Sequence, residues 1–204
     1  VKKPFGPVLG KVNIPNYLIN KLNDFVDETI DNNTELGNEL DHGKKLVGQV
    51  SQEIKISEDL IKSDMNDYLY NITKGYIELA MKREVKNFKI MSAWIVRQFE
   101  NEYNPIHYHN GHISGAGYIK LPDSFGDTLQ KGKVNYNGNI NFIHGVTQFL
   151  SDGHTSITPK VGDFYIFPNY LYHSVNPFYG TGERRSLSFN ALIDNEIFDV
   201  YSPR

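Results

Sequence analysis

Three histidines of the chain have a placement that suits a metal site. His107 and His109 lie in NPIHYHNGH, directly after a predicted strand and a proline. Residues two apart in extended backbone point to the same face, so both imidazoles can converge on one point. His173 follows a short apolar strand and the Pro168-Asn169 turn, which would fix its position. The three imidazoles together predict a metal centre, although each alone is as typical of a solvated or structural histidine.

A polar strand face is the second feature that could do chemistry. In ERRSLSFNALI, alternation separates a polar face from an apolar one: the polar face holds Arg184, Ser186, Ser188 and Asn190, and the other holds Arg185, Leu187, Phe189 and Ala191. A buried arginine is costly unless it pairs with an anion, and an arginine with a serine two residues further on suits a carboxylate ligand. The simpler alternative is a solvated Arg184 paired with an acidic side chain. We expect Arg185 to be the solvent-facing member of the pair.

The elements that must position these residues change in character near residue 87. The first half predicts a strand at 8–14, a helix after Pro15, a loop at 32–43 and a helix from Ser57 to about Arg83, with Leu79 on its core-facing side. From residue 88 onward, short runs rich in β-branched and aromatic residues predict strands. These strands are expected at 89–99, 113–121, 134–143, 156–158, 163–167 and 184–193.

Strands of this number and spacing are typical of a sandwich or jelly roll. We expect a mainly β fold whose N-terminal helices pack on one sheet. The length of 204 residues fits one domain, residues 1–204, with a helical part at 1–87 and a jelly-roll core at 88–197.

Composition narrows the class of protein. The chain has no cysteine, which excludes disulfides, cysteine-ligated metals and thiol nucleophiles. Its formal net charge is -3, and its lysines and arginines are scattered, so no basic stripe indicates nucleic-acid binding. No apolar run approaches the roughly 20 residues of a membrane span. Without a secretory signal in the N-terminal stretch, we expect a cytoplasmic protein.

The segments HYHNGHISGAGYIKLP, GDFYIFPNYLYHSVNP and RRSLSFN resemble three blocks of the 2-oxoglutarate/Fe(II)-dependent oxygenase family, prolyl-hydroxylase-like and of phage or bacterial type. The resemblance covers about residues 88–193, and the blocks occur in the family's order. It implies a double-stranded β-helix, that is, a jelly-roll or cupin-like fold with iron at its open mouth. It also implies Fe(II), 2-oxoglutarate (2OG) and O2 as cofactor and cosubstrates.

The same resemblance implies roles for the three histidines. His107 and His173 match iron ligands by position, and His109 stands where most of these oxygenases have Asp or Glu. His109 either ligates the iron or leaves that position to water, and Asn110 and His112 are near enough in sequence to compete with it.

For the cosubstrate, the resemblance implies that Arg184 and Ser186 bind the distal carboxylate of 2OG. Tyr118 occupies a place where related hydroxylases direct a tyrosine hydroxyl to the same carboxylate. Asn190, on the polar face of the last strand, would line the substrate or cosubstrate pocket.

The function implied is a dioxygenase that hydroxylates an unidentified substrate, either a protein or a small molecule, with peptidyl proline as the first hypothesis. Two alternatives remain. A three-histidine cupin-type dioxygenase or isomerase without 2OG would explain His109 but would leave Arg184 without a role. A non-catalytic jelly-roll binding module would have histidines too far apart to chelate a metal.

Overall fold

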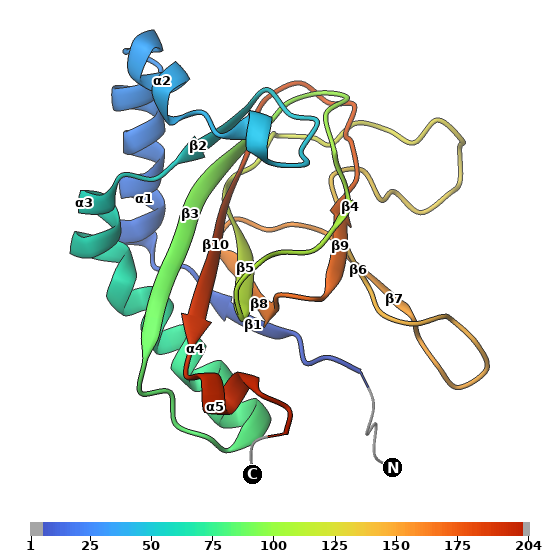
Figure 1. The fold of residues 1–204 in the computed structure, drawn as a ribbon. Helices are drawn as coiled ribbons and strands as arrows, with labels where there is room; N and C mark the ends of the chain where they lie inside the picture. The colour runs from blue at the N-terminus through green and yellow to red at the C-terminus, as the bar shows by residue number, and fades with distance from the viewer. Residues whose placement is uncertain (1–5, 202–204) are drawn as a thin grey trace.

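The computed structural model describes residues 6–201 and contains two stacked antiparallel sheets (Figure 1). The larger sheet has the strand order β1-β8-β5-β10-β3-β2, and the smaller has the order β4-β9-β6-β7. The strands are β1 (Gly10–Asn13), β2 (Gln52–Lys55), β3 (Phe88–Gln98), β4 (Asn104–His107), β5 (Ile113–Lys120), β6 (Ile140–Ile143), β7 (His154–Ile157), β8 (Asp163–Pro168), β9 (Tyr172–Val175) and β10 (Arg184–Ile193). The expected mainly β architecture with helices is confirmed.

Apart from α5 (Asn195–Phe198), the helices in the described part of the chain come before β3 in the sequence. They are α1 (Asn16–Asp24), a π-helix (Phe25–Ile30), α2 (Thr34–Leu40), a 3-10 turn (Gly43–Lys45), α3 (Glu58–Leu60), a π-helix (Ile61–Met65) and α4 (Asn66–Met81). Figure 1 shows α1 and α4 on the outer face of the larger sheet, with the smaller sheet on its other side. The expected packing of the N-terminal helices on one sheet is therefore observed.

The prediction of a loop at 32–43 is wrong, because this segment contains α2. The Asn33 side chain caps the helix by accepting a hydrogen bond from the Leu36 N–H at 3.1 Å. Gly37, which suggested a loop, is buried within the helix. A Cβ there would lie 3.2 Å from Ile30, so the glycine permits close packing rather than ending the helix.

Short strands account for most other differences from the sequence prediction. β2, β4 and β9 have four residues each and were not predicted, and β4 contains Pro105. The strand expected at 134–143 begins only at Ile140. Leu79, expected in the core, is 78% exposed on α4.

The larger sheet separates two apolar cores. The core between the sheet and the helices includes Leu18, Leu22, Leu69, Ile95, Leu187, Phe189 and Ala191. The core between the two sheets includes Tyr118, Ile140, Phe142, Tyr165, Phe167 and Val175. A Cβ on Gly117 of β5 would lie 2.3 Å from the Phe164 ring, so β5 needs glycine there to let the ring pack. The alternation predicted for β10 is thus observed, with its apolar face on the helical side.

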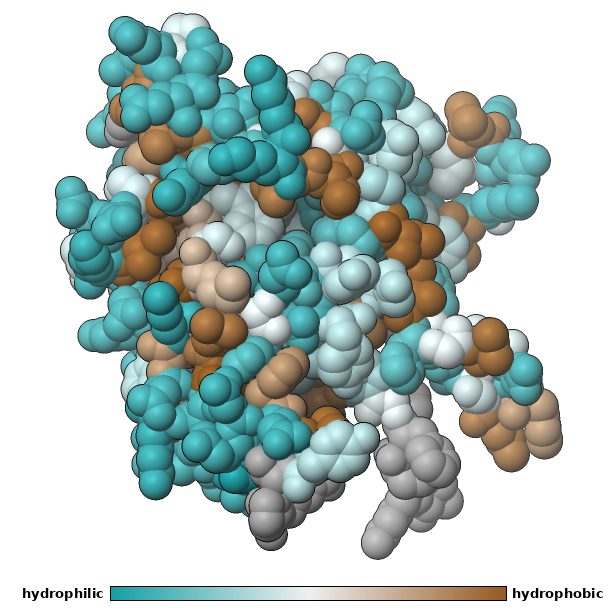
Figure 2. Space-filling model, in the orientation of Figure 1, coloured by the Kyte–Doolittle hydropathy of each residue, from teal (hydrophilic) through white to brown (hydrophobic). Residues whose placement is uncertain are grey.

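The surface in view is mostly hydrophilic, and apolar residues gather on the two loops that project on the right (Figure 2). These loops include the exposed side chains of Leu129, Phe149 and Leu150. Among the described residues, no helix is long and apolar enough to cross a membrane.

Candidate metal centre

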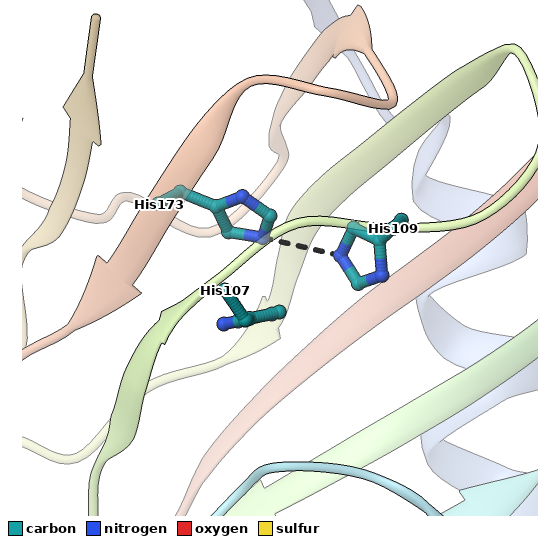
Figure 3. A group of neighbouring side chains, drawn as sticks. All are labelled: His107, His109 and His173. Atoms are coloured by element: carbon teal, nitrogen blue, oxygen red, sulfur yellow. Dashed lines mark hydrogen bonds between the residues drawn. The ribbon is translucent and has the colours of Figure 1, made fainter.

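His107, His109 and His173 come together beside β4 and β9 of the smaller sheet (Figure 3). His107 ends β4 and pairs with His173 of β9 across the ladder, while His109 lies two residues beyond the strand. The N–H of His109 donates to the Asn169 carbonyl at 3.0 Å, which ties that loop to the turn before β9. One ring nitrogen from each histidine lies within 4.8 Å of the other two. This spacing allows one cation to contact all three.

The opposite ring nitrogens of two histidines are held by backbone carbonyls. Nδ1 of His107 lies 2.7 Å from the Pro105 oxygen, and Nδ1 of His173 lies 2.9 Å from the Leu171 oxygen. A carbonyl can only accept, so each Nδ1 carries the proton and each Nε2 keeps its lone pair for a metal. Nε2 of His109 and Nε2 of His173 face each other at 3.1 Å.

Burial keeps the three imidazoles neutral. It lowers the pKa of all three, and the other imidazoles lower the pKa of His109 further, to about 2, and that of His173 to about 4. Protons therefore compete little with a metal at neutral pH. Aromatic rings fix the orientation, with Trp94 edge-on to His109 at 5.7 Å and Phe167 edge-on to His173 at 5.0 Å between ring centroids. Three neutral imidazoles form a donor set that fits a divalent iron ion.

The histidines line a cavity of about 340 Å³ between the two sheets. The polar face of β10 forms one wall, with Arg184, Ser186, Ser188 and Asn190. The sequence suggested seven residues for the metal and the cosubstrate. Six of them line this one cavity: His107, His109, His173, Arg184, Ser186 and Asn190. The seventh, Tyr118, lies beside this wall on β5, in register with Ser186, and is fully buried in the core between the sheets.

Arg184 is a buried cation without an anionic partner among the described residues. Its side chain is 1% exposed, one guanidinium nitrogen donates to Gln98 Oε1, and its Nε has no hydrogen-bond partner in residues 6–201. The guanidinium lies 5.0 Å from the centroid of the Tyr118 ring, and the Tyr118 hydroxyl interacts with this guanidinium but makes no hydrogen bond of good geometry within residues 6–201. Burial lowers the pKa of Arg184. Two unpartnered donors beside an unneutralised charge fit the carboxylate of a ligand such as 2OG.

Arg185 does not face solvent as expected; it is 1% exposed. It donates to Glu183 Oε2 at 2.7 Å and to Asp27 Oδ1 at 2.6 Å, where the π-helix covers the sheet. Arg97 pairs with the same Glu183 at 2.6 Å and with Asp31. Both arginines lie opposite the cavity, on the helical side of the sheet. The contrast is that Arg185 is neutralised and Arg184 is not.

The other polar candidates have specific places. Ser114 donates to Asn190 Oδ1 at 2.8 Å, which orients the Asn190 amide in the cavity wall. His112 is outside the histidine cluster: Nδ1 accepts from the Ile193 N–H at 3.1 Å, and its ring stacks on Phe198. Asn110 lines the cavity.

Three residues of the site escaped sequence reasoning. Gln98 holds Arg184, and it could have been found only by pairing β3 with β10 in the correct register. Trp94 lines the cavity beside His109. Glu53 lines the same cavity from β2, a strand that the sequence did not predict.

Residues 92–190 match a family model described as "Putative 2OG-Fe(II) oxygenase". Over these residues the chain is similar to the 2OG-Fe(II) oxygenase family. The matched segment contains all three histidines together with Arg184, and it confirms the family indicated by the three sequence blocks. Iron and 2OG are the cofactor and cosubstrate in the description of the family that this segment matches. None of the curated proteins compared with the chain matches it.

Solved structures confirm the double-stranded β-helix. A prolyl-4-hydroxylase of Pseudomonas putida is 15% identical, with a TM-score of 0.58 over 91% of each chain. A collagen prolyl hydroxylase of Paramecium Bursaria Chlorella virus-1, in a 2OG complex, is 13% identical, with a TM-score of 0.54 over 90% of this chain and 94% of that one. HygX of Streptomyces hygroscopicus, with nickel and 2OG bound, is 7% identical, with a TM-score of 0.55 over 90% and 81%. Likeness at these identities shows the fold alone.

Proposed function

We propose that the chain is an Fe(II)- and 2OG-dependent dioxygenase that hydroxylates a prime substrate and releases succinate and CO2. The observation that carries this proposal is the convergence of three neutral imidazoles with an unpaired, buried Arg184 in one cavity. The family match over residues 92–190 supports the same reaction class. The helical part up to residue 87 and the jelly-roll core at 88–197 would act as one domain, because residues of both form a common apolar core.

Each group has a defined task in this proposal. His107, His109 and His173 would hold Fe(II) through ring nitrogens whose lone pairs are free of protons. Arg184 would bind the distal carboxylate of 2OG, with the Tyr118 hydroxyl as a second donor. When bound together, iron and 2OG supply the oxidative chemistry, in which O2 is consumed, 2OG yields succinate and CO2, and a substrate C–H bond gains a hydroxyl group.

Ser186 and Asn190 would complete the polar wall of the cavity. Ser186 lies two residues from Arg184 on the same strand face, where its hydroxyl can donate to the same carboxylate. Asn190, oriented by Ser114, would contact the cosubstrate or the prime substrate. The apolar rings of Trp94 and Phe167 flank the histidines and would limit water around the metal.

The prime substrate is a separate question, because relatives with this fold bind different molecules. A prolyl hydroxylase of Trichoplax adhaerens was solved with a peptide fragment of a hypoxia inducible factor, and HygX was solved with hygromycin B. Peptidyl proline is therefore the first substrate hypothesis, and a small molecule is the second.

Anaerobic titration of Fe(II) and 2OG tests the proposed function. We expect the visible absorption band of an Fe(II)–2OG complex and, once air is admitted, slow succinate release without prime substrate. Both should be absent from His173→Ala. A protein that binds Fe(II) but gives no 2OG-dependent band would favour the three-histidine enzyme without 2OG, which His109 also suits.

A further inference from the structure

Glu53 is a buried carboxyl group that the proposed reaction does not use. It lies on β2 and lines the same cavity as the three histidines. The residue is only 3% exposed, and its Oε2 has no hydrogen-bond partner within residues 6–201. Its backbone, by contrast, is fully engaged: the N–H donates to Asp41 Oδ1 at 3.2 Å and the carbonyl accepts from the His42 N–H at 2.9 Å. The backbone is held in place while the carboxyl group lacks a partner.

A second unpartnered acceptor lies beside it. Oδ1 of Asn104 is buried, and it too has no hydrogen-bond partner in the described part of the chain. A Cβ placed on Gly48 would lie 2.5 Å from this oxygen and 3.1 Å from both carboxyl oxygens of Glu53. The acceptors of Glu53 and Asn104 therefore converge beneath the 43–48 loop, whose Lys45, Leu46 and Val47 line the cavity.

Residues 6–201 supply no cation that pairs with these two acceptors. Lys45 is exposed, and no ion pair joins it to Glu53 among residues 6–201. Asp41, whose Oδ1 accepts from the Glu53 N–H, is also acidic and opposes ionisation of Glu53. Burial, with this repulsion, raises the pKa of Glu53 to about 7. A buried carboxylate is stable only when it is paired, so the site is suited to a positively charged donor from outside.

Strand register separates this acceptor pair from the proposed cosubstrate site on β10. Glu53 pairs with Val96 across β2 and β3, and Val96 pairs with Ser186, which places Glu53 two strands from the Arg184 wall, about 10 Å away. Asn104 precedes His107 by three residues on β4. A substrate that binds between Glu53 and Asn104 would therefore extend toward the metal without displacing the cosubstrate.

We propose that Glu53 and Asn104 form the recognition site for a protonated amine of the prime substrate. An ammonium group offers three N–H donors, enough for both unpartnered oxygens, and it neutralises the buried carboxylate. A neutral amide or hydroxyl group would satisfy the hydrogen bonds but would leave the charge of Glu53 unpaired. The assignment of this amine to the prime substrate rests on the proposed oxygenase function, whereas the cation site itself does not.

The test measures binding of small ammonium probes rather than turnover. n-Butylammonium and its neutral counterpart 1-butanol are titrated into the protein, followed by NMR, with and without Ni(II) and 2OG. The peptide acetyl-Gly-Lys-Gly-amide and its Nε-acetylated form provide a second pair. Variants are Glu53→Gln, which keeps the shape and removes the charge, and Glu78→Gln, a matched change at an exposed position on α4 outside the cavity lining.

We expect the ammonium probes to bind and their neutral counterparts to bind at least about tenfold more weakly, as for a lost charge-assisted hydrogen bond. Glu53→Gln should remove this preference, while Glu78→Gln retains it and both variants keep the wild-type affinity for Ni(II) and 2OG. Tighter binding of the lysine peptide than of n-butylammonium would identify a peptidyl amine as the source. Equal binding would identify a small-molecule amine.

Three results would overturn the cation site: no binding of either ammonium probe, equal binding of the neutral counterparts, or an unchanged preference in Glu53→Gln. The proposed function fails independently if Ni(II) and 2OG do not bind. If Ni(II) and 2OG do not bind but ammonium binding still depends on Glu53, the cation site is supported and the proposed oxygenase function is not.

Discussion

Replacing Arg184 by methionine tests whether Arg184 binds an anionic ligand. Its neighbour Arg185 forms ion pairs within the protein and serves for comparison. Met keeps most of the side-chain length but removes the charge and every donor. In the ligand-free protein this relieves an unpaired buried charge and leaves Gln98 Oε1 without its donor. The two effects oppose each other, so we expect the free energy of unfolding to change by less than about 1 kcal/mol.

The loss should appear instead in cosubstrate binding. Removing one partner of a buried charge-assisted pair costs about 2–4 kcal/mol, which corresponds to a roughly 30- to 700-fold rise in the Kd for 2OG. The assay is calorimetric titration of 2OG into the Ni(II)-loaded protein under anaerobic conditions. Affinity for Ni(II) itself should stay within about twofold, since Arg184→Met leaves the three imidazoles untouched.

Arg185→Met is the control, with the opposite expectation. It breaks buried ion pairs with Glu183 and Asp27, although Glu183 keeps Arg97 as a partner and Asp27 is half exposed. Denaturant unfolding should show a loss of about 2–3 kcal/mol, near the lower end for a broken buried pair. Its 2OG affinity should change little. Equal 2OG affinities in wild type and Arg184→Met, or a larger loss in Arg185→Met, would refute the assignment of Arg184 as the anion anchor.

Three further changes test other parts of the structure. His109→Ala should weaken Ni(II) or Fe(II) binding at least about tenfold in a metal titration, and unchanged affinity would mean that His109 is not a ligand. The Glu53 carboxyl keeps its proton in the folded protein up to a pKa of about 7, whereas the unfolded chain ionises from about 4.5, so folding stability should fall by about 3 kcal/mol as pH rises from 4.5 to 8. Chemical unfolding of ligand-free Glu53→Gln at pH 4.5 and 8 should lack this fall, and an identical pH profile would contradict it. Gly117→Ala would bring a methyl group to 2.3 Å from the Phe164 ring and should destabilise the fold by about 1–3 kcal/mol, whereas an unchanged melting temperature would show that the ring can move aside.

The histidines and the β10 face could be predicted because both depend on local geometry. Alternation in extended backbone fixes which residues share a face, and it placed Arg184, Ser186 and Asn190 correctly in one wall. The meeting of His173 with His107 required more, namely the pairing of β4 with β9. Sequence spacing does not contain that pairing, and the family resemblance supplied it.

The environment of Arg185 could not be predicted for a related reason. Alternation correctly separated it from Arg184, but the choice between solvent and burial depends on what covers the other face of the sheet. The cover is the π-helix that carries Asp27, about 160 residues earlier in the chain. A strand pattern alone is the same whether its outer face meets water or a charged helix.

His109 changes where negative charge lies in the cavity. A carboxylate at that position would place an acidic group against the metal, whereas three neutral imidazoles place none. The acidic side chain in the cavity lining is Glu53, which lies on another strand, beneath the 43–48 loop. A cation entering the cavity is therefore attracted toward Glu53 when its carboxyl group is ionised, because no other acidic side chain of the described residues lines this cavity. The metal ligands and the acidic side chain are thus different groups. Metal binding and recognition of a charged substrate therefore do not compete for one carboxylate.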